Sequence, residues 1–173
     1  MPIIFQTKNL QFKKRESRIP EFTWNTSPRL AKMADSKHLQ FDIRSLDPGG
    51  FSFPYHFHRA SEELFFILSG EANLRSPEGF QKVTQGDLIF FEEGPLGAHQ
   101  LYNHGDTPCV YLDIRAMFGI DVCEYPDSGK IYILPYQEVF ESDSKVDYYK
   151  GEENVASNWP QEMIRKPSES QIR

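Results

Sequence analysis

The sequence predicts an all-β fold, either an antiparallel barrel or a sandwich. Three observations lead to this prediction: many short apolar runs, turn residues at close spacing between them, and an aromatic content of 14%. Aromatic residues favour strands, and short strands separated by Gly, Pro, Asn and Asp are typical of closed or stacked sheets. No stretch in the middle of the chain has the pattern of a long helix.

The first predicted strand begins at Leu39, where Leu39, Phe41 and Ile43 alternate with polar residues, the pattern of a half-buried strand. The turn that starts at Asp47 (Asp-Pro-Gly-Gly) ends it. Turn sequences such as Ser-Pro-Glu-Gly from Ser76 separate the strands that follow. These strands are predicted over residues 51–58, 63–68, 72–76, 81–84, 88–91, 99–103, 109–115 and 130–134.

The two ends of the chain differ from this middle part. Residues 1–37 show weak periodicity, and we predict an arm that packs on the barrel or on a partner subunit. Residues 38–140 are predicted to form the barrel as one domain. Residues 141–173 are polar and charged, and they are predicted to be a C-terminal extension.

Charge and cysteine content argue against several classes of function. The net charge of −6, from 19 basic and 25 acidic residues, disfavours a nucleic-acid partner. No apolar run approaches the length of a membrane span, and the apolar N-terminus is too short for a secretory signal. The two cysteines, Cys109 and Cys123, make no disulfide framework, so a cytoplasmic location is expected.

His56 and His58 stand one residue apart in a chain that has five histidines. On a strand over residues 51–58, alternation places both imidazoles on one face. Glu63 opens the next apolar strand, and its carboxylate reaches the same point if the two strands pair as a hairpin. His99 begins a later strand and offers a third imidazole. Such a set suits a divalent transition metal, whereas two solvent-facing histidines are the alternative interpretation.

The spacing around these histidines resembles the first motif of the cupin superfamily. Its fixed positions are filled by Gly50, His56, His58, Glu63 and Gly70.

A later stretch resembles the second cupin motif, with Gly86, Pro95, Gly97, His99 and Asn103 at its fixed positions, although one residue fewer than usual separates Gly97 from His99. Together with the Tyr-Pro-Asp-Ser-Gly-Lys turn, the chain is similar to a subgroup of small single-domain bacterial cupins. The resemblance covers roughly residues 39–134.

This resemblance implies a cupin-type double-stranded β-helix, a small jelly-roll barrel with a metal ion inside. It implies four metal ligands, His56, His58, Glu63 and His99, and leaves the catalytic residues unknown. Glu62 competes with Glu63, but its spacing to the motif glycine is one residue too long, and strand alternation sends it to the opposite face. The expected cofactor is one divalent transition metal: Mn, Fe, Ni, Co or Zn.

The resemblance also implies a metal-dependent enzyme of the oxygenase, decarboxylase or isomerase class. Its substrate would be a small polar molecule such as a keto acid, a dicarboxylate or a sugar. The alternative is a non-catalytic cupin that binds or senses a sugar or an organic acid.

In the strand over residues 109–115, one of two alternating sets must face the barrel interior. If the polar set Tyr111, Asp113 and Arg115 does so, these side chains could bind a substrate. A surface position is the expectation for them, and the sequence does not decide the question.

Strand alternation points a set of large apolar side chains away from the histidine face. Monomers rarely leave such a patch exposed, so the N-terminal arm, a partner subunit or both must cover it. We therefore predict a homodimer with a sheet-on-sheet interface. The residues of this set are Phe51, Phe53, Tyr55, Phe57, Leu64, Phe66 and Leu68.

Overall fold

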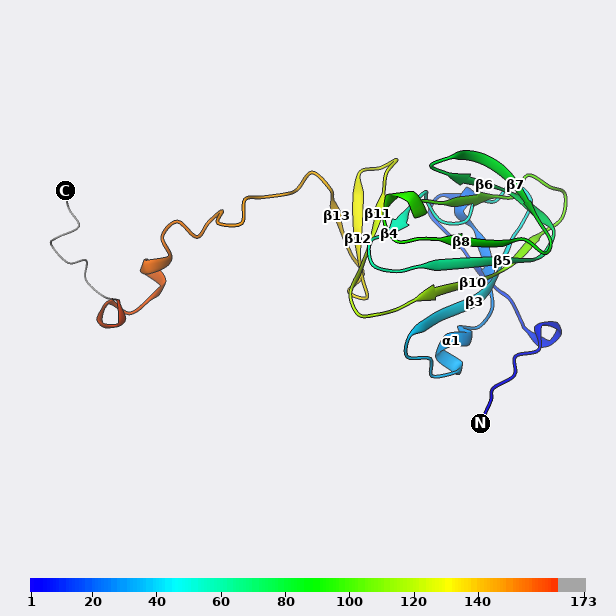
Figure 1. Cartoon of the computed structure of the whole chain (residues 1–173), viewed down its shortest axis with the longest axis horizontal. Helices are drawn as coiled ribbons and strands as arrows, with labels where there is room; N and C mark the ends of the chain where they lie inside the picture. Colours follow the sequence, from blue (N-terminus) through cyan, green and yellow to red (C-terminus); the bar gives the residue numbers. More distant parts are fainter. Residues whose placement is uncertain (165–173) are drawn as a thin grey trace. The chain divides into compact units, whose positions relative to one another are not determined.

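The computed structural model describes residues 1–164 and confirms the all-β class. The chain consists of two compact units, Met1–Ser142 and Asp143–Arg173. Within the described residues, every strand belongs to the first unit (Figure 1). The described part of the second unit contains two short 3₁₀ helices, η4 (Val155–Asn158) and η5 (Gln161–Met163).

The strands of the first unit are short, and mostly short turns and loops connect them. One α-helical turn, α1 (Leu30–Met33), and three 3₁₀ turns, η1 (Thr7–Asn9), η2 (Pro20–Phe22) and η3 (Pro95–Gly97), interrupt them. The strands are β1 (Lys13–Arg15), β2 (Trp24–Thr26), β3 (Leu39–Leu46), β4 (Phe57–His58), β5 (Glu63–Ser69), β6 (Glu71–Ser76), β7 (Gly79–Thr84), β8 (Leu88–Phe91), β9 (Gln100–Tyr102), β10 (Cys109–Ala116), β11 (Asp121–Tyr125), β12 (Lys130–Leu134) and β13 (Glu138–Glu141).

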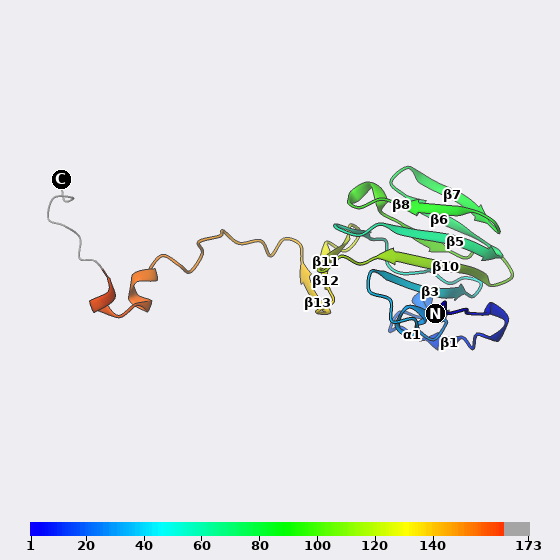
Figure 2. The ribbon, with the colours of Figure 1, turned by 60° about the horizontal axis from the view of Figure 1, so that its bottom comes forward.

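The strands form two facing layers. One layer is a six-stranded sheet in the order β1-β2-β3-β10-β5-β8, and Figure 2 shows four of its strands, β3, β10, β5 and β8, side by side. The other layer consists of the sheets β13-β12-β11-β4 and β7-β6-β9, which an isolated bridge between His56 and His99 joins. Strand alternation directs Phe65 and Ile67 from the first layer and Leu74 and Leu101 from the second into one buried core.

The segment before β3 packs on the barrel of its own chain. Strands β1 and β2 extend the six-stranded sheet. The Trp24 ring meets the Phe53 ring edge-on, with centroids 4.9 Å apart, and the Phe22 and Phe51 rings lie 6.1 Å apart. These contacts cover two of the aromatic side chains that the sequence pattern places on an outward face.

The predicted continuous strand over residues 51–58 is wrong. Only Phe57 and His58 form a strand there, because the chain bends around Pro54, which has no N–H group to donate to a ladder. As a result, Tyr55 and Phe57 are buried in a small cluster with Ala98 and do not point outward. Strand β4 pairs with β11, so the hairpin that would bring Glu63 to the histidines does not form.

Candidate metal centre

His56 and His99 are cross-strand neighbours. The His56 N–H donates to the His99 carbonyl at 3.3 Å, and the His99 N–H donates to the His56 carbonyl at 2.9 Å. Residues that exchange both backbone hydrogen bonds in an antiparallel pair point their side chains to the same face. The two rings therefore meet inside the barrel with centroids 4.8 Å apart, and His58 follows two residues later with its ring 5.3 Å from that of His56.

Glu63 reaches these rings from the opposite layer. It is the first residue of β5, and its Oε2 atom lies 3.2 Å from His99 Nε2 and 3.5 Å from His58 Nε2. All four side chains are buried. Glu62 is exposed, as alternation predicts. The structure thus brings together the four residues that the sequence analysis singles out, although through different strand pairings from those expected.

Each imidazole is fixed by a hydrogen bond at its outer nitrogen. The Nδ1 atoms of His56 and His99 lie 2.9 and 2.8 Å from the carbonyl oxygens of Pro54 and Gly97. A carbonyl can only accept, so both rings carry their proton on Nδ1 and leave the Nε2 lone pair free. Metal-binding histidines are oriented by the same kind of outer hydrogen bond.

The donor atoms at the centre fit a divalent cation. His99 Nε2 and Glu63 Oε2 are buried, and neither has a hydrogen-bond partner among residues 1–164. Buried polar groups without a partner cost about 1–3 kcal/mol each, so such atoms require a ligand. Donor atoms of His56, His58 and Glu63 all lie within 4.8 Å of one another. Two ligands at right angles, each about 2.1 Å from an ion, lie about 3 Å apart, close to the distances found here.

The protonation states of His56 and Glu63 favour a positive ion at this point, whereas that of His58 opposes it. Burial lowers the pKa of His56 to about 3, and the neighbouring His99 acts in the same direction. Burial also lowers the pKa of His58, but hydrogen bonds, above all to Asp121, outweigh it and raise this pKa to about 11. Burial raises the pKa of Glu63, yet the adjacent His58 and His99 rings outweigh this effect and hold the pKa well below its usual range. Metal binding therefore requires release of the proton on His58.

Asp121 is a site residue that the sequence analysis missed. Its Oδ2 atom lies 2.5 Å from His58 Nδ1, and its Oδ1 atom accepts the Ala60 N–H at 3.1 Å. Cys123, two residues later on β11, places its Sγ atom 3.3 Å from the same His58 nitrogen. The turn that begins at Tyr125 could have indicated both residues. A predicted strand directly after a tight turn, here residues 130–134, implies a partner strand directly before that turn.

The polar set of β10 faces the barrel interior, so the expectation of a surface position is wrong. Tyr111 and Asp113 are 0% and 4% exposed. Burial raises the pKa of Asp113 to about 6, against the effect of Arg44, with which it forms an ion pair. His56, His58 and Glu63 open into a cavity of about 140 Å³, whose wall also includes Gln40, Arg44, Phe53, Asp113, Arg115, Cys123, Tyr125, Tyr132 and Leu134.

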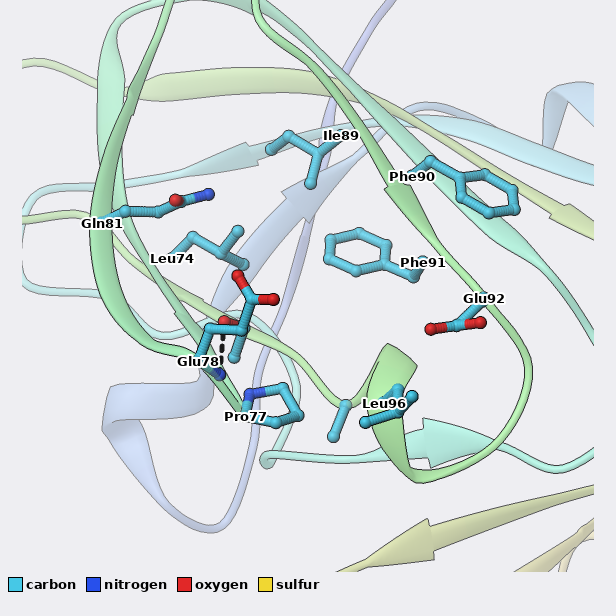
Figure 3. Close-up of a pocket in the computed structure, with 11 residues that line it drawn as sticks. Leu74, Pro77, Glu78, Gln81, Ile89, Phe90, Phe91, Glu92 and Leu96 are labelled. Atoms are coloured by element: carbon cyan, nitrogen blue, oxygen red, sulfur yellow. Dashed lines mark hydrogen bonds between the residues drawn. The ribbon is translucent and has the colours of Figure 1, made fainter.

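A larger cavity of about 470 Å³ is lined by Phe91 and by residues of β6, β7 and β8 (Figure 3). The Phe91 ring also stacks on His99 with centroids 3.8 Å apart. Figure 3 shows Phe91 and Ile89 directed toward this cavity, with the carboxylates of Glu78 and Glu92 near its edge. None of the four donor residues lines it, and we place the chemistry in the smaller cavity.

The family model of the cupin domain matches residues 43–115, which include all four donor residues, half of β3, strands β4 to β9 and most of β10. The chain contains a cupin domain. No curated protein sequence matches the chain. Among the described residues, no helix combines the length and the apolar character that a membrane crossing needs.

Several solved structures share the fold of this chain. A putative sugar phosphate isomerase from Acidithiobacillus ferrooxidans superposes with a TM-score of 0.74 at 21% identity, over 83% of this chain and 95% of that one. A cupin-superfamily sugar phosphate isomerase from Silicibacter pomeroyi gives 0.70 at 16% identity, over 86% and 98%. A predicted oxalate decarboxylase from Thermotoga maritima gives 0.55 at 18% identity, over 67% and 100%.

Proposed function

We propose that this cupin is a metal-dependent enzyme that acts on a small polar substrate, in an oxygenase, decarboxylase or isomerase reaction. The observation that carries the proposal is the pair of buried atoms without partners, His99 Nε2 and Glu63 Oε2, directed toward two further imidazoles. Support also comes from the similar structures, whose names include sugar phosphate isomerases and a predicted oxalate decarboxylase.

In this proposal His56, His58, Glu63 and His99 hold one Mn, Fe, Ni, Co or Zn ion. Such an ion supplies a Lewis acid that polarises a bound carbonyl or carboxylate oxygen. The protein residues hold the donors in place through their outer hydrogen bonds and enclose the substrate in a small cavity. That cavity has room for about five water molecules at about 30 Å³ each, so only a small molecule enters it.

The test is elemental analysis of the purified protein and its variants. We expect about one metal ion per chain in the wild type, and loss of most of it in His58→Ala and His99→Ala, because each removes one nitrogen donor. His104→Ala is the control, since this histidine is on the surface and pairs with Glu71. Equal metal content in all three variants would reject the site. Thermal-shift screening with sugars, keto acids and dicarboxylates then finds compounds that bind. Analysis of the mixture for product distinguishes turnover from binding alone.

A homodimer is the second part of the proposal. Alternation on three adjacent strands of the six-stranded sheet places apolar side chains on its outer face, where Leu88 and Phe90 are 64% and 59% exposed. A flat apolar face of this kind fits the same face of a second copy. The other residues of this outer face are Leu64, Phe66, Leu112 and Ile114. A cytoplasmic location, with which the free thiols Cys109 and Cys123 agree, stays a prediction.

A further inference from the structure

Two arginines line the metal cavity, and they differ in what they contact. Arg44 forms an ion pair with Asp113, and its guanidinium carbon lies 4.9 Å from the centre of the Phe53 ring. Burial lowers the pKa of Arg44, but the Asp113 carboxylate outweighs this effect and raises the pKa above its usual value. The charge of Arg44 is therefore compensated by the protein itself.

Arg115 has no such compensation. Its Nε atom is buried without a hydrogen-bond partner, and no ion pair joins its guanidinium to a carboxylate in the part of the chain that the structure describes. Its cross-strand neighbour on β5 is Glu63, whose Oε2 atom lies against His58 and His99. A buried N–H group of a charged side chain is costly when it is unpaired, so this one calls for an acceptor from outside the chain.

Arg115 lines the metal cavity, and such an acceptor can bind there. Strand register puts Arg115 beside Gln40 on one side and Glu63 on the other, and all three side chains line the cavity. An acceptor in this cavity occupies a space that is lined by Arg115 and by three of the four metal donors, His56, His58 and Glu63. With Glu63 at the metal and Asp113 on Arg44, no carboxylate of the wall is left to balance Arg115 and the ion together.

We infer that Arg115 binds the anionic group of the ligand, so that the ligand is a small carboxylate or phosphate that spans Arg115 and the metal. The inference rests on the proposed function, because the second contact of the ligand is the metal. A planar guanidinium offers two parallel N–H groups to a carboxylate or phosphate, whereas a hydroxyl group of an uncharged sugar leaves the charge uncompensated. Arg115 thereby selects acids and phosphate esters over neutral sugars.

The test measures binding to the full-length Co²⁺-loaded protein by isothermal titration calorimetry. The probes are malonate, inorganic phosphate and imidazole, the last as a neutral ligand that needs only the metal. Arg115→Gln is expected to lower the affinity for malonate, for phosphate or for both at least tenfold. It is expected to leave imidazole binding and metal content unchanged. Arg115→Lys keeps the charge without the paired N–H groups, so an intermediate loss is expected.

Arg59→Gln is the matched control, because this arginine is an exposed side chain that pairs with Glu124 and does not line the cavity. A loss confined to malonate assigns a carboxylate, and a loss confined to phosphate assigns a phosphate group. Binding of both anions to Arg115→Gln at wild-type strength, or of neither anion to the wild type, overturns the inference. A wild type without metal refutes the proposed function instead, and anion binding to the metal-free variants then still decides the role of Arg115.

Discussion

Asp121 acts on the metal through His58. Its carboxylate lies against His58 Nδ1 and fixes the ring so that Nε2 faces the other donors. Carboxylates in this position raise the basicity of the ligating imidazole, and their loss commonly costs 10–100-fold in metal affinity. We therefore expect Asp121→Ala to lower the affinity for the metal by about 10–100-fold.

Asp121→Asn is expected to lower the metal affinity less than Asp121→Ala does, because the amide oxygen can still accept a hydrogen bond from the imidazole N–H. Chelator competition measures both affinities. Glu124→Gln serves as the control, since this residue is on the same strand but pairs with the surface residue Arg59. An affinity of Asp121→Ala equal to that of this control would show that the contact orients nothing.

Residue types and spacing were sufficient to predict His56, His58, Glu63 and His99 as one group, since these positions follow a known spacing. They were insufficient for Asp121 and Cys123. These two come from a strand that the sequence pattern did not reveal, because Asp-Val-Cys-Glu-Tyr has only a weak alternation of apolar side chains. The interior face of β10 was undecidable for a related reason: both of its alternating sets contain residues that a buried position could accept.

At the scale of elements, η3 determines where His99 stands. A Cβ atom on Gly97 would lie 1.8 Å from the backbone carbonyl oxygen of Glu92, a contact that no side-chain rotation can relieve. The Gly97 carbonyl also accepts the hydrogen bond from His99 Nδ1 at 2.8 Å. The tight loop therefore requires glycine at position 97, and the orientation of the His99 imidazole requires this loop.

From this packing we expect Gly97→Ala to destabilise the fold by about 1–3 kcal/mol, the usual cost of forcing atoms into a packed site. For a chain of this size that corresponds to a fall of roughly 5 °C in the melting temperature. Metal affinity should fall with it, because His99 moves with the loop. Differential scanning calorimetry of the metal-free protein measures the first effect. Leu96→Ala is the control, because Leu96 is in the same turn and is 73% exposed. A melting temperature of Gly97→Ala equal to that of Leu96→Ala would contradict the steric role of Gly97.

Strand alternation predicted most of the elements, because a half-buried strand imposes a period of two on its sequence. It failed between Phe51 and His58, where Pro54 bends the chain and the alternation no longer reports which way a side chain points. The short spacing between Gly97 and His99 directly follows η3, which ends at Gly97. Which strand pairs with which depends on contacts between distant residues, and local sequence carries little of that information.

For the whole molecule, the open question is what covers the six-stranded sheet. The segment before β3 covers part of it, since the Phe5 and Phe41 rings lie 6.3 Å apart. Farther across the sheet, register places Phe66 of β5 between Leu112 of β10 and Leu88 of β8. Phe66 is only half-buried and Leu88 is exposed, so this part of the face lacks a cover within the described residues.

A second copy of the chain is the proposed cover, and Phe66→Glu tests it. Wild-type protein is expected to run as a dimer at micromolar concentration in size-exclusion chromatography with light scattering. The variant is expected to run as a monomer, because a carboxylate at the centre of a dry interface would be buried without a partner. Phe80→Glu, at an 80% exposed position on β7, controls for the added charge and should remain a dimer. Because Phe66 points away from the cavity, the monomeric variant should also keep its metal, and a wild type that is monomeric under these conditions would refute the interface.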